Sequence, residues 1–177
     1  MSNILAIDGS TKRTGYAFIK DGQINYGAIT SASTDPEKRI GIMRDGIIRI
    51  IQENNIDTVV MEEVRPDNLN ARTGKLLTWL QGCIVVAIFE YNKKIKINFI
   101  GPSSWRSVLG IQGYRIKREE QKKKDIEYAN KTYNIQLTAE QDDEADALCI
   151  LKSYIKDAAT LAIKKPQSPI GSEESAF

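Results

Sequence analysis

The chain lacks histidine altogether, which removes the side chain that most often serves as a general base at neutral pH. This absence excludes a catalytic triad that pairs serine or cysteine with histidine. It also excludes a zinc site built from imidazole ligands. Any catalysis by this chain must therefore use carboxylates, lysines, hydroxyl groups or a metal ion held by oxygen ligands.

Cysteine is also scarce: the chain has only Cys83 and Cys149, and they form no Cys-x-x-Cys motif. Each lies in an apolar stretch with helical character. We therefore expect two buried, reduced thiols that contribute to packing, and no disulfide.

Long apolar runs and an excess of one charge are missing too. No continuous apolar segment approaches the ~20 residues that a membrane helix needs, and the first residues carry neither a basic segment nor a cleavage signal. We expect a cytoplasmic protein without membrane contact. With 25 basic and 23 acidic residues the net charge is only +2, so a nucleic-acid surface would have to come from local clustering of basic side chains.

The order of apolar patterns predicts an α/β fold, and 177 residues suffice for one domain with a sizeable core. A continuous apolar run at 4–8 is typical of a central strand covered on both faces, and Asp21-Gly22 predicts a tight hairpin. We expect strands at 4–8, 14–20, 23–30, 57–62 and 96–100, and helices at 36–54, about 69–91, 102–109, 117–132 and 138–164. This order predicts a mixed five-stranded sheet flanked by helices within residues 1–164, followed by a polar, disordered tail at 165–177.

Acidic residues end two of the apolar strands. Asp8 closes the run at 4–8, and Glu62 closes the run at 57–62. If these strands are parallel neighbours, about 4.8 Å apart, both carboxylates lie at the same edge of the sheet, where ligands of open α/β sheets gather. An acid after a strand can also simply begin a solvated loop, so neither residue alone identifies a site.

A third acidic group opens the last predicted helix. Asp143 and Asp146 are three residues apart on one helix face, where their like charges repel unless a cation is present. Acids in a first turn also complement the helix dipole, which alone accounts for Asp142 and Glu144 and can account for Asp143. The coincidence of three acidic features, two of which end apolar strands, favours a shared site for Mg²⁺ or Mn²⁺.

Basic residues cluster in the predicted helix at 117–132. A phosphate backbone would relieve the repulsion among three consecutive lysines in this helix, and the alternative is an ordinary solvated helix face. The candidate DNA-contacting residues in this cluster are Lys117, Arg118, Lys122, Lys123 and Lys124. Further candidates near the expected acidic edge are Arg65, Arg72, Lys75 and Arg106.

The predicted helix at 69–91 is apolar on all sides between Cys83 and Phe89. Such a helix needs partners on two sides, and its own sheet can supply only one. The outer side is covered either by later helices of the same chain or by a second copy across a two-fold axis.

Three segments combine the acids with a fixed local context. They are Ile7-Asp8-Gly9-Ser10-Thr11-Lys12-Arg13-Thr14-Gly15-Tyr16, Val60-Met61-Glu62-Glu63-Val64 and Asp143-Glu144-Ala145-Asp146-Ala147-Leu148. In order and spacing, over about residues 3–155, the chain resembles the RuvC-type Holliday-junction resolvases. Its size and its content of lysine, isoleucine and asparagine are similar to those of the phage-encoded members.

The resemblance implies an RNase H-like fold, a homodimer and two Mg²⁺ ions in each active site, with Mn²⁺ as a substitute. It assigns the catalytic, metal-binding acids to Asp8, Glu62, Asp143 and Asp146. Glu62 matches better than Glu63, because the family's acid directly follows an apolar pair, which is Val60-Met61 in this chain. The alternation of side chains along the strand does not by itself decide between the two glutamates.

The chain departs from the family pattern in two places. Gly9 follows Asp8 directly, where the family usually has a proline between them, and we expect little consequence. The loop at 64–69 lacks the aromatic residue that family members often place near the junction centre, and Trp79 and Tyr114 are the aromatic residues that could replace it. We therefore expect recognition by branch shape more than by base sequence.

The implied function is a metal-dependent, structure-specific endonuclease that cleaves branched DNA, including Holliday junctions, forks and flaps, in the bacterial cytoplasm if it is phage-encoded. A branched-DNA-binding protein without catalysis is one alternative. An actin-like or sugar-kinase-type ATPase domain is another, since such domains also begin with a strand and an Asp-Gly-Ser/Thr turn. The chain shows neither the second phosphate loop nor the adenosine-binding glycine motif that such an ATPase needs.

Overall fold

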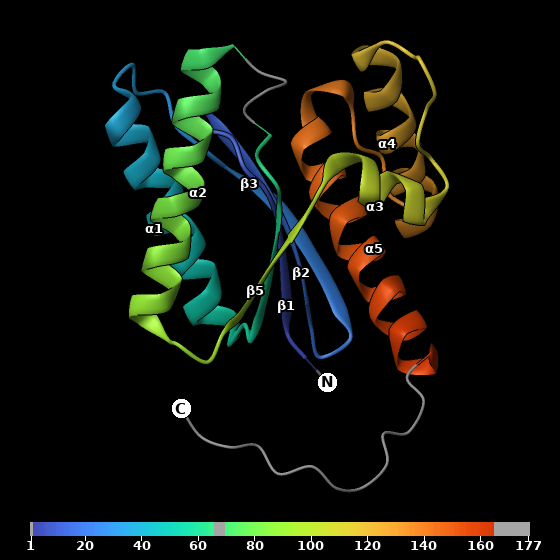
Figure 1. Cartoon of the computed structure of the whole chain (residues 1–177), viewed down its shortest axis with the longest axis horizontal. Coiled ribbons are helices and arrows are strands. Elements are labelled where there is room, and N and C mark those ends of the chain that lie inside the picture. The colour runs from blue at the N-terminus through green and yellow to red at the C-terminus, as the bar shows by residue number, and fades with distance from the viewer. Residues whose placement is uncertain (1, 66–69, 165–177) are drawn as a thin grey trace, which may run out of the picture.

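A mixed β-sheet lies between two layers of helices (Figure 1). The computed structural model describes residues 2–65 and 70–164, with side chains up to residue 157. The tail expected at 165–177 and most of the loop at 64–69 lie outside the described residues. Helices α1 and α2 cover one face of the sheet, and α3, α4 and α5 cover the other.

The five strands have the order β3-β2-β1-β4-β5. Their bounds are β1 Ile4–Asp8, β2 Arg13–Lys20, β3 Gln23–Thr30, β4 Thr58–Glu62 and β5 Lys96–Ile100. The pairs β1–β2 and β2–β3 are antiparallel, whereas β1–β4 and β4–β5 are parallel. Asp21 and Gly22 both have positive φ angles, as a two-residue hairpin turn requires. The predicted mixed five-stranded sheet is confirmed.

The helices begin and end near the predicted residues. Their bounds are α1 Pro36–Asn54, α2 Ala71–Tyr91, α3 Pro102–Leu109, α4 Arg118–Tyr133 and α5 Asp142–Lys164. At the start of α1, the Asp35 side chain accepts hydrogen bonds from the backbone N–H groups of Glu37 and Lys38. The predicted capping box of Thr138 and Gln141 is present, but it opens a short 3₁₀ turn, Ala139–Gln141, so the α-helix itself begins at Asp142.

The sheet has a separate hydrophobic core on each face. Toward α1 and α2 the core contains large side chains, among them Leu5, Ile7, Met43, Ile47, Ile51, Leu80, Ile84 and Ile88. Toward α3, α4 and α5 the strands present the small residues Ala6 and Ala17, against which Leu148 and Leu151 of α5 pack. Burial on both faces explains why β1 reads as a continuous apolar run. The small residues let α5 lie close to the sheet.

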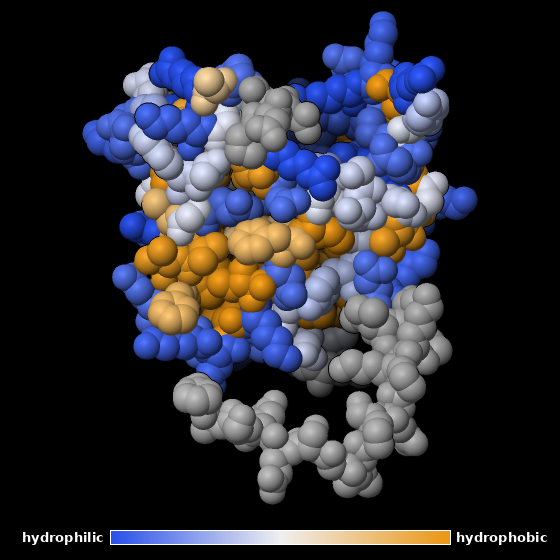
Figure 2. Space-filling model, in the orientation of Figure 1, coloured by the Kyte–Doolittle hydropathy of each residue, from blue (hydrophilic) through white to orange (hydrophobic). Residues whose placement is uncertain are grey.

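Within the described residues the outer face of α2 is uncovered, and the exposure of a cysteine in this helix corrects one prediction. Cys149 is buried as expected, but Cys83 is exposed. The later helices all lie on the opposite side of the sheet, so within the described residues they do not cover α2 (Figure 1). Figure 2 shows an apolar patch on the side of the molecule where α2 and β5 lie. Large apolar or aromatic side chains are exposed on these two elements, namely Trp79, Val86 and Phe89 on α2 and Phe99 on β5.

By length and composition alone, α2 would also suffice to cross a membrane. One such helix is weak evidence, because core helices of other proteins pass the same test. Here Leu80, Ile84 and Ile88 are buried against the sheet and α1, so the inner side of α2 is part of the protein core.

Candidate active site

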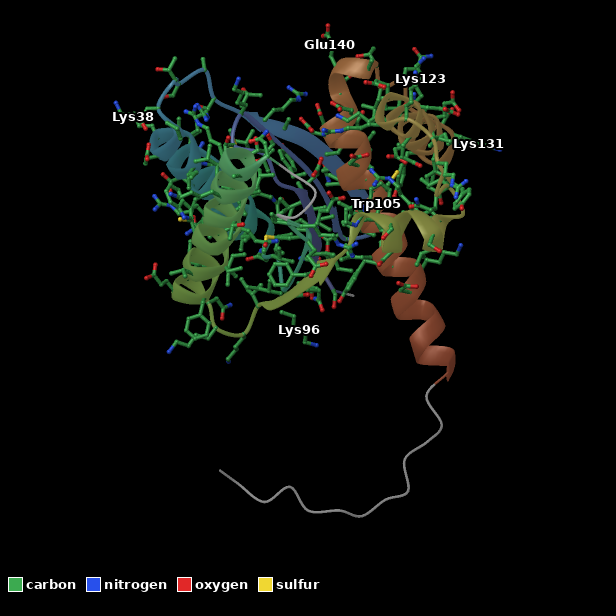
Figure 3. The ribbon with its side chains drawn as sticks, turned by 45° about the horizontal axis from the view of Figure 1, so that its top comes forward. Lys38, Lys96, Trp105, Lys123, Lys131 and Glu140 are labelled. Atoms are coloured by element: carbon green, nitrogen blue, oxygen red, sulfur yellow. The ribbon has the colours of Figure 1, made fainter. Side chains whose placement is uncertain are left out.

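Two of the predicted acids lie side by side at one edge of the sheet. Strands β1 and β4 are parallel neighbours in which Ile7 pairs with Met61, so the next residues, Asp8 and Glu62, leave the sheet at the same edge. This edge is at the top of Figure 1, and Figure 3 turns it toward the viewer. The sequence pattern of two apolar strands that end in acids therefore corresponds to a real juxtaposition.

The beginning of α5 reaches the same edge and adds the other two predicted acids. Asp143 and Asp146 line a cleft of about 910 Å³ together with Asp8 and Glu62. Gly15 of β2, which pairs with Asp8, makes this approach possible. A Cβ atom on Gly15 would overlap the main-chain carbonyl of Asp143. Three distant segments thus bring all four acids to one cleft.

Burial makes the ionised form of these acids unfavourable. It raises the pKa of Asp8 well above its usual value, and the charges of Glu62, Asp146 and Asp143 raise it further. Burial is also the largest cause of the raised pKa values of Glu62, Asp143 and Asp146. Lys122 opposes the shift at Asp8, Asp143 and Asp146 by its positive charge. A bound cation would relieve the same cost.

The donor chemistry of the cleft fits a divalent metal ion. Carboxylate oxygens are the ligands that Mg²⁺ and Mn²⁺ prefer. The buried Oδ1 atom of Asp146 has no hydrogen-bond partner among the residues that the structure describes. Within the described residues, however, no three acidic side chains stand close enough together to hold one ion in their present positions. Two of these carboxylates lie near basic side chains instead, Asp143 at 3.6 Å from Arg13 and Asp146 at 3.7 Å from Arg106.

Two predicted DNA-contacting residues, Arg106 and Lys122, line the cleft and form ion pairs with acidic side chains. Arg106 of α3 forms an ion pair with the fully buried Asp125 at 2.9 Å, and its guanidinium lies 3.7 Å from Asp146. Lys122 of α4 forms an ion pair with Asp142. Both cations therefore contribute positive charge to the cleft itself.

The remaining basic candidates are divided between the cleft and the outer surface. Arg65, Arg72 and Arg118 line the cleft. Lys75, Lys117, Lys123 and Lys124 do not. The three consecutive lysines cannot share one face of α4, because successive helical residues are rotated by about 100°. Lys122 faces the cleft, whereas Lys123 is exposed (Figure 3).

The two neighbouring glutamates at the end of β4 have different surroundings. The Oε2 atom of Glu62 accepts a hydrogen bond of 2.7 Å from the indole N–H of Trp105. The Glu63 side chain is 51% exposed and lies 3.5 Å from Arg65. Both glutamates line the cleft, but Glu62 is held by Trp105, whereas Glu63 is half exposed.

Sequence reasoning missed several residues that organise the cleft. Trp105 holds Glu62, Asp125 holds Arg106, and Arg13 of β2 forms ion pairs with Asp143 and with the buried Glu144. The one sequence signal for these contacts was the adjacent pair Trp105 and Arg106, a tryptophan next to a basic residue in a short predicted helix. Asp125 gave none, because it follows a run of lysines typical of an exposed helix.

Comparison with known proteins identifies the family of this chain. Residues 1–157 match the DUF3882 family model, described as Lactococcus phage M3 protein. The chain belongs to this family. No curated protein sequence matches it.

Solved structures share its fold at low sequence identity. Thermus thermophilus RuvC in complex with a Holliday junction substrate has a TM-score of 0.69 and 14% identity, over 90% of this chain and 96% of that one. A second Thermus thermophilus RuvC structure has a TM-score of 0.65 and 16% sequence identity, and the match covers 89% of this chain and 96% of that one. The yeast mitochondrial Holliday junction resolvase Ydc2 has a TM-score of 0.60 and 16% sequence identity, and the match covers 92% of this chain and 81% of that one. The predicted RNase H-like fold and the likeness to RuvC-type proteins are confirmed.

Proposed function

We propose that this chain is a metal-dependent endonuclease that cleaves branched DNA. The observation that carries the proposal is that one cleft is lined by Asp8, Glu62, Asp143 and Asp146. Burial and the charges of the neighbouring acids raise the pKa of Asp8, and a bound cation would stabilise its ionised form. The fold supports it, since a RuvC structure with the same architecture is described in complex with a Holliday junction substrate. The family description as a phage protein supports a role in the cytoplasm of a bacterial host.

The four acids would hold two Mg²⁺ ions, for which Mn²⁺ would substitute. Bound divalent ions would supply the charge that activates water and stabilises the leaving 3′-oxygen in phosphodiester hydrolysis. Arg106 and Lys122 are positioned to attract a phosphate into the cleft, because each carries a positive charge beside the acids. Arg13 holds Asp143 by an ion pair at 3.6 Å and so fixes the beginning of α5.

Basic residues around the cleft would bind the DNA backbone. Arg65, Arg72 and Arg118 line its walls, and phosphate contacts at such positions orient the DNA without reading its sequence. Lys75, Lys117, Lys123 and Lys124 lie outside the cleft and would contact duplex arms further away. Selection of substrate would then follow branch shape, with cuts spread over several sites near the branch point.

The outer face of α2 would bind a second copy of the chain. Trp79, Val86 and Phe89 recur there at helical spacing, and Phe99 of β5 extends the patch. Apolar patches of this kind mark interaction sites, and a two-fold axis allows one patch to contact itself. A homodimer would carry two clefts, one for each of two strands of a junction. Residues 1–164 would form the nuclease domain.

A panel of DNA substrates tests the proposal. With Mg²⁺ present, we expect cleavage of four-way junctions, forks and flaps, and no comparable cleavage of linear duplex. Junctions with varied core sequences should all be cut. Tight binding of branched DNA without any cleavage would instead support the non-catalytic alternative. The ATPase alternative requires ATP turnover, which the same preparation can be assayed for.

A further inference from the structure

A buried tryptophan contacts one of the four acids from behind the cleft. Trp105 is fully buried in α3, between the sheet and α5, and its indole N–H donates to Oε2 of Glu62 at 2.7 Å (Figure 3). A buried indole N–H needs a hydrogen-bond partner, but a backbone carbonyl would serve as well as a carboxylate. Here the partner is an acid that faces the cleft.

The short helix α3 is held rigidly at this position. Gly101 and Pro102 begin it, and Gly110, with φ of 75°, ends it in the left-handed conformation. The next residue, Arg106, stacks on the Trp105 ring at 4.1 Å and donates to the fully buried Asp125 at 3.0 Å. Trp105 therefore has little freedom to move with the Glu62 side chain.

This geometry gives the two oxygens of Glu62 different tasks. Trp105 occupies Oε2 with a neutral donor, which fixes the carboxylate in the plane of that hydrogen bond. A neutral donor leaves the negative charge of the carboxylate available, whereas an arginine or lysine in the same place would compete with a metal ion. The Oε1 atom remains for a ligand in the cleft that Glu62 lines.

We infer that Trp105 is a positioning residue, whose indole N–H orients Glu62 so that one carboxylate oxygen is presented to a divalent metal ion. This inference rests on the proposed function. Hydrogen-bond partners of metal ligands typically change metal affinity 10–100-fold when they are removed. A tryptophan that served packing alone would affect stability but not the affinity for metal.

Metal binding to the full-length protein, measured by calorimetry without DNA, tests the inference. Trp105→Phe keeps an aromatic ring and removes the N–H, so we expect Mg²⁺ and Mn²⁺ to bind about 10–100-fold more weakly. Tyr133→Phe is the matched control, because it also removes one hydrogen-bond donor from an aromatic side chain packed against the core, here one that donates to the main-chain carbonyl of Leu148 and does not line the cleft. Its metal affinity should equal that of the wild type. Wild-type affinity in a folded Trp105→Phe protein would overturn the inference.

A second measurement needs no variant at the site. The wild-type protein has two indole N–H groups, which nitrogen-15 NMR resolves as two signals. Titration with Mg²⁺ should shift the signal of Trp105 and leave that of Trp79 in place, with assignment from Trp79→Phe. An unmoved Trp105 signal at saturating metal would overturn the inference while leaving the proposed function intact. If the wild type bound no divalent ion at all, both would fail.

Discussion

Gly15 of β2 lies directly against the main-chain carbonyl of Asp143, so closely that a methyl group on Gly15 would overlap it. This contact sets the position of the α5 start relative to Asp8, the residue that pairs with Gly15 across the sheet. The glycine in the first motif thus serves the geometry of the third.

Replacing Gly15 by alanine should therefore damage both stability and the cleft. Overpacking of this kind typically costs about 1–3 kcal/mol, and the displaced α5 would carry Asp143 and Asp146 away from Asp8. Chemical denaturation and the rate of junction cleavage measure the two effects. Gly41→Ala is the control, since a Cβ there meets open space within α1 and should stabilise the helix by about 0.5–1 kcal/mol. Equal stability of Gly15→Ala and wild type would refute the close contact.

Much of the fold could be predicted because its information is local. The hairpin turn at Asp21-Gly22 and the strand at 4–8 were evident in the sequence, and the bounds of β1, β3, β5, α1 and α3 match the prediction. The proximity of Asp8 and Glu62 could be predicted because parallel neighbouring strands end at the same edge of the sheet. Local patterns combined with one topological rule were enough for that.

The rest depended on contacts that no local pattern encodes. Cys83 was predicted to be buried because its neighbours are apolar, but an apolar helix face does not tell whether its partner is the same chain or another. The pairs Trp105–Glu62 and Arg106–Asp125 join segments that are distant in sequence. No local sequence pattern therefore predicts that these side chains meet. In α4, helical rotation separates the lysines that the sequence presents as one cluster.

Glu62→Gln should reduce cleavage far more than Glu63→Gln. Both residues line the cleft, but Glu62 is hydrogen-bonded to Trp105, whereas Glu63 is half exposed beside Arg65. Loss of a direct metal ligand should cost at least the ~100-fold that loss of a ligand's hydrogen-bond partner can cost. Single-turnover cleavage of a four-way junction by each variant measures the difference. A reversed order of rates would mean that Glu63 is the ligand.

Replacing Lys122, Lys123 and Lys124 together by alanine should weaken binding to all DNA substrates. Each lost contact with a duplex phosphate should lower the slope of log affinity against log salt by about 0.9. Lys131→Ala, on the exposed last turn of the same helix, is the control and should leave the slope unchanged (Figure 3). An unaltered slope in the triple variant would mean that none of these three lysines contacts a duplex phosphate.

Val86→Asp should convert a dimer into a monomer in sedimentation experiments at micromolar concentration. The charge would fall within the apolar outer face of α2, whereas Ile42→Asp places the same charge on an exposed apolar residue of α1 and should leave the dimer intact. Cys83 should react faster with thiol reagents in the monomer. Cys149 should stay unreactive in both, because burial raises the pKa of its thiol. A wild-type chain that sediments as a monomer, with and without DNA, would refute the dimer.

Binding and cleavage of a four-way junction, measured side by side for the wild type and Asp8→Asn, test whether the acids of the cleft hold catalytic metal ions. The substitution keeps the shape of a side chain that lines the cleft and removes its charge. We expect the wild type to cut the junction in Mg²⁺ but not in EDTA, and Asp8→Asn to bind it at least as tightly without cutting. Cleavage by the wild type in EDTA, or by Asp8→Asn at the wild-type rate, would mean that the junction is not cut by metal ions held at Asp8.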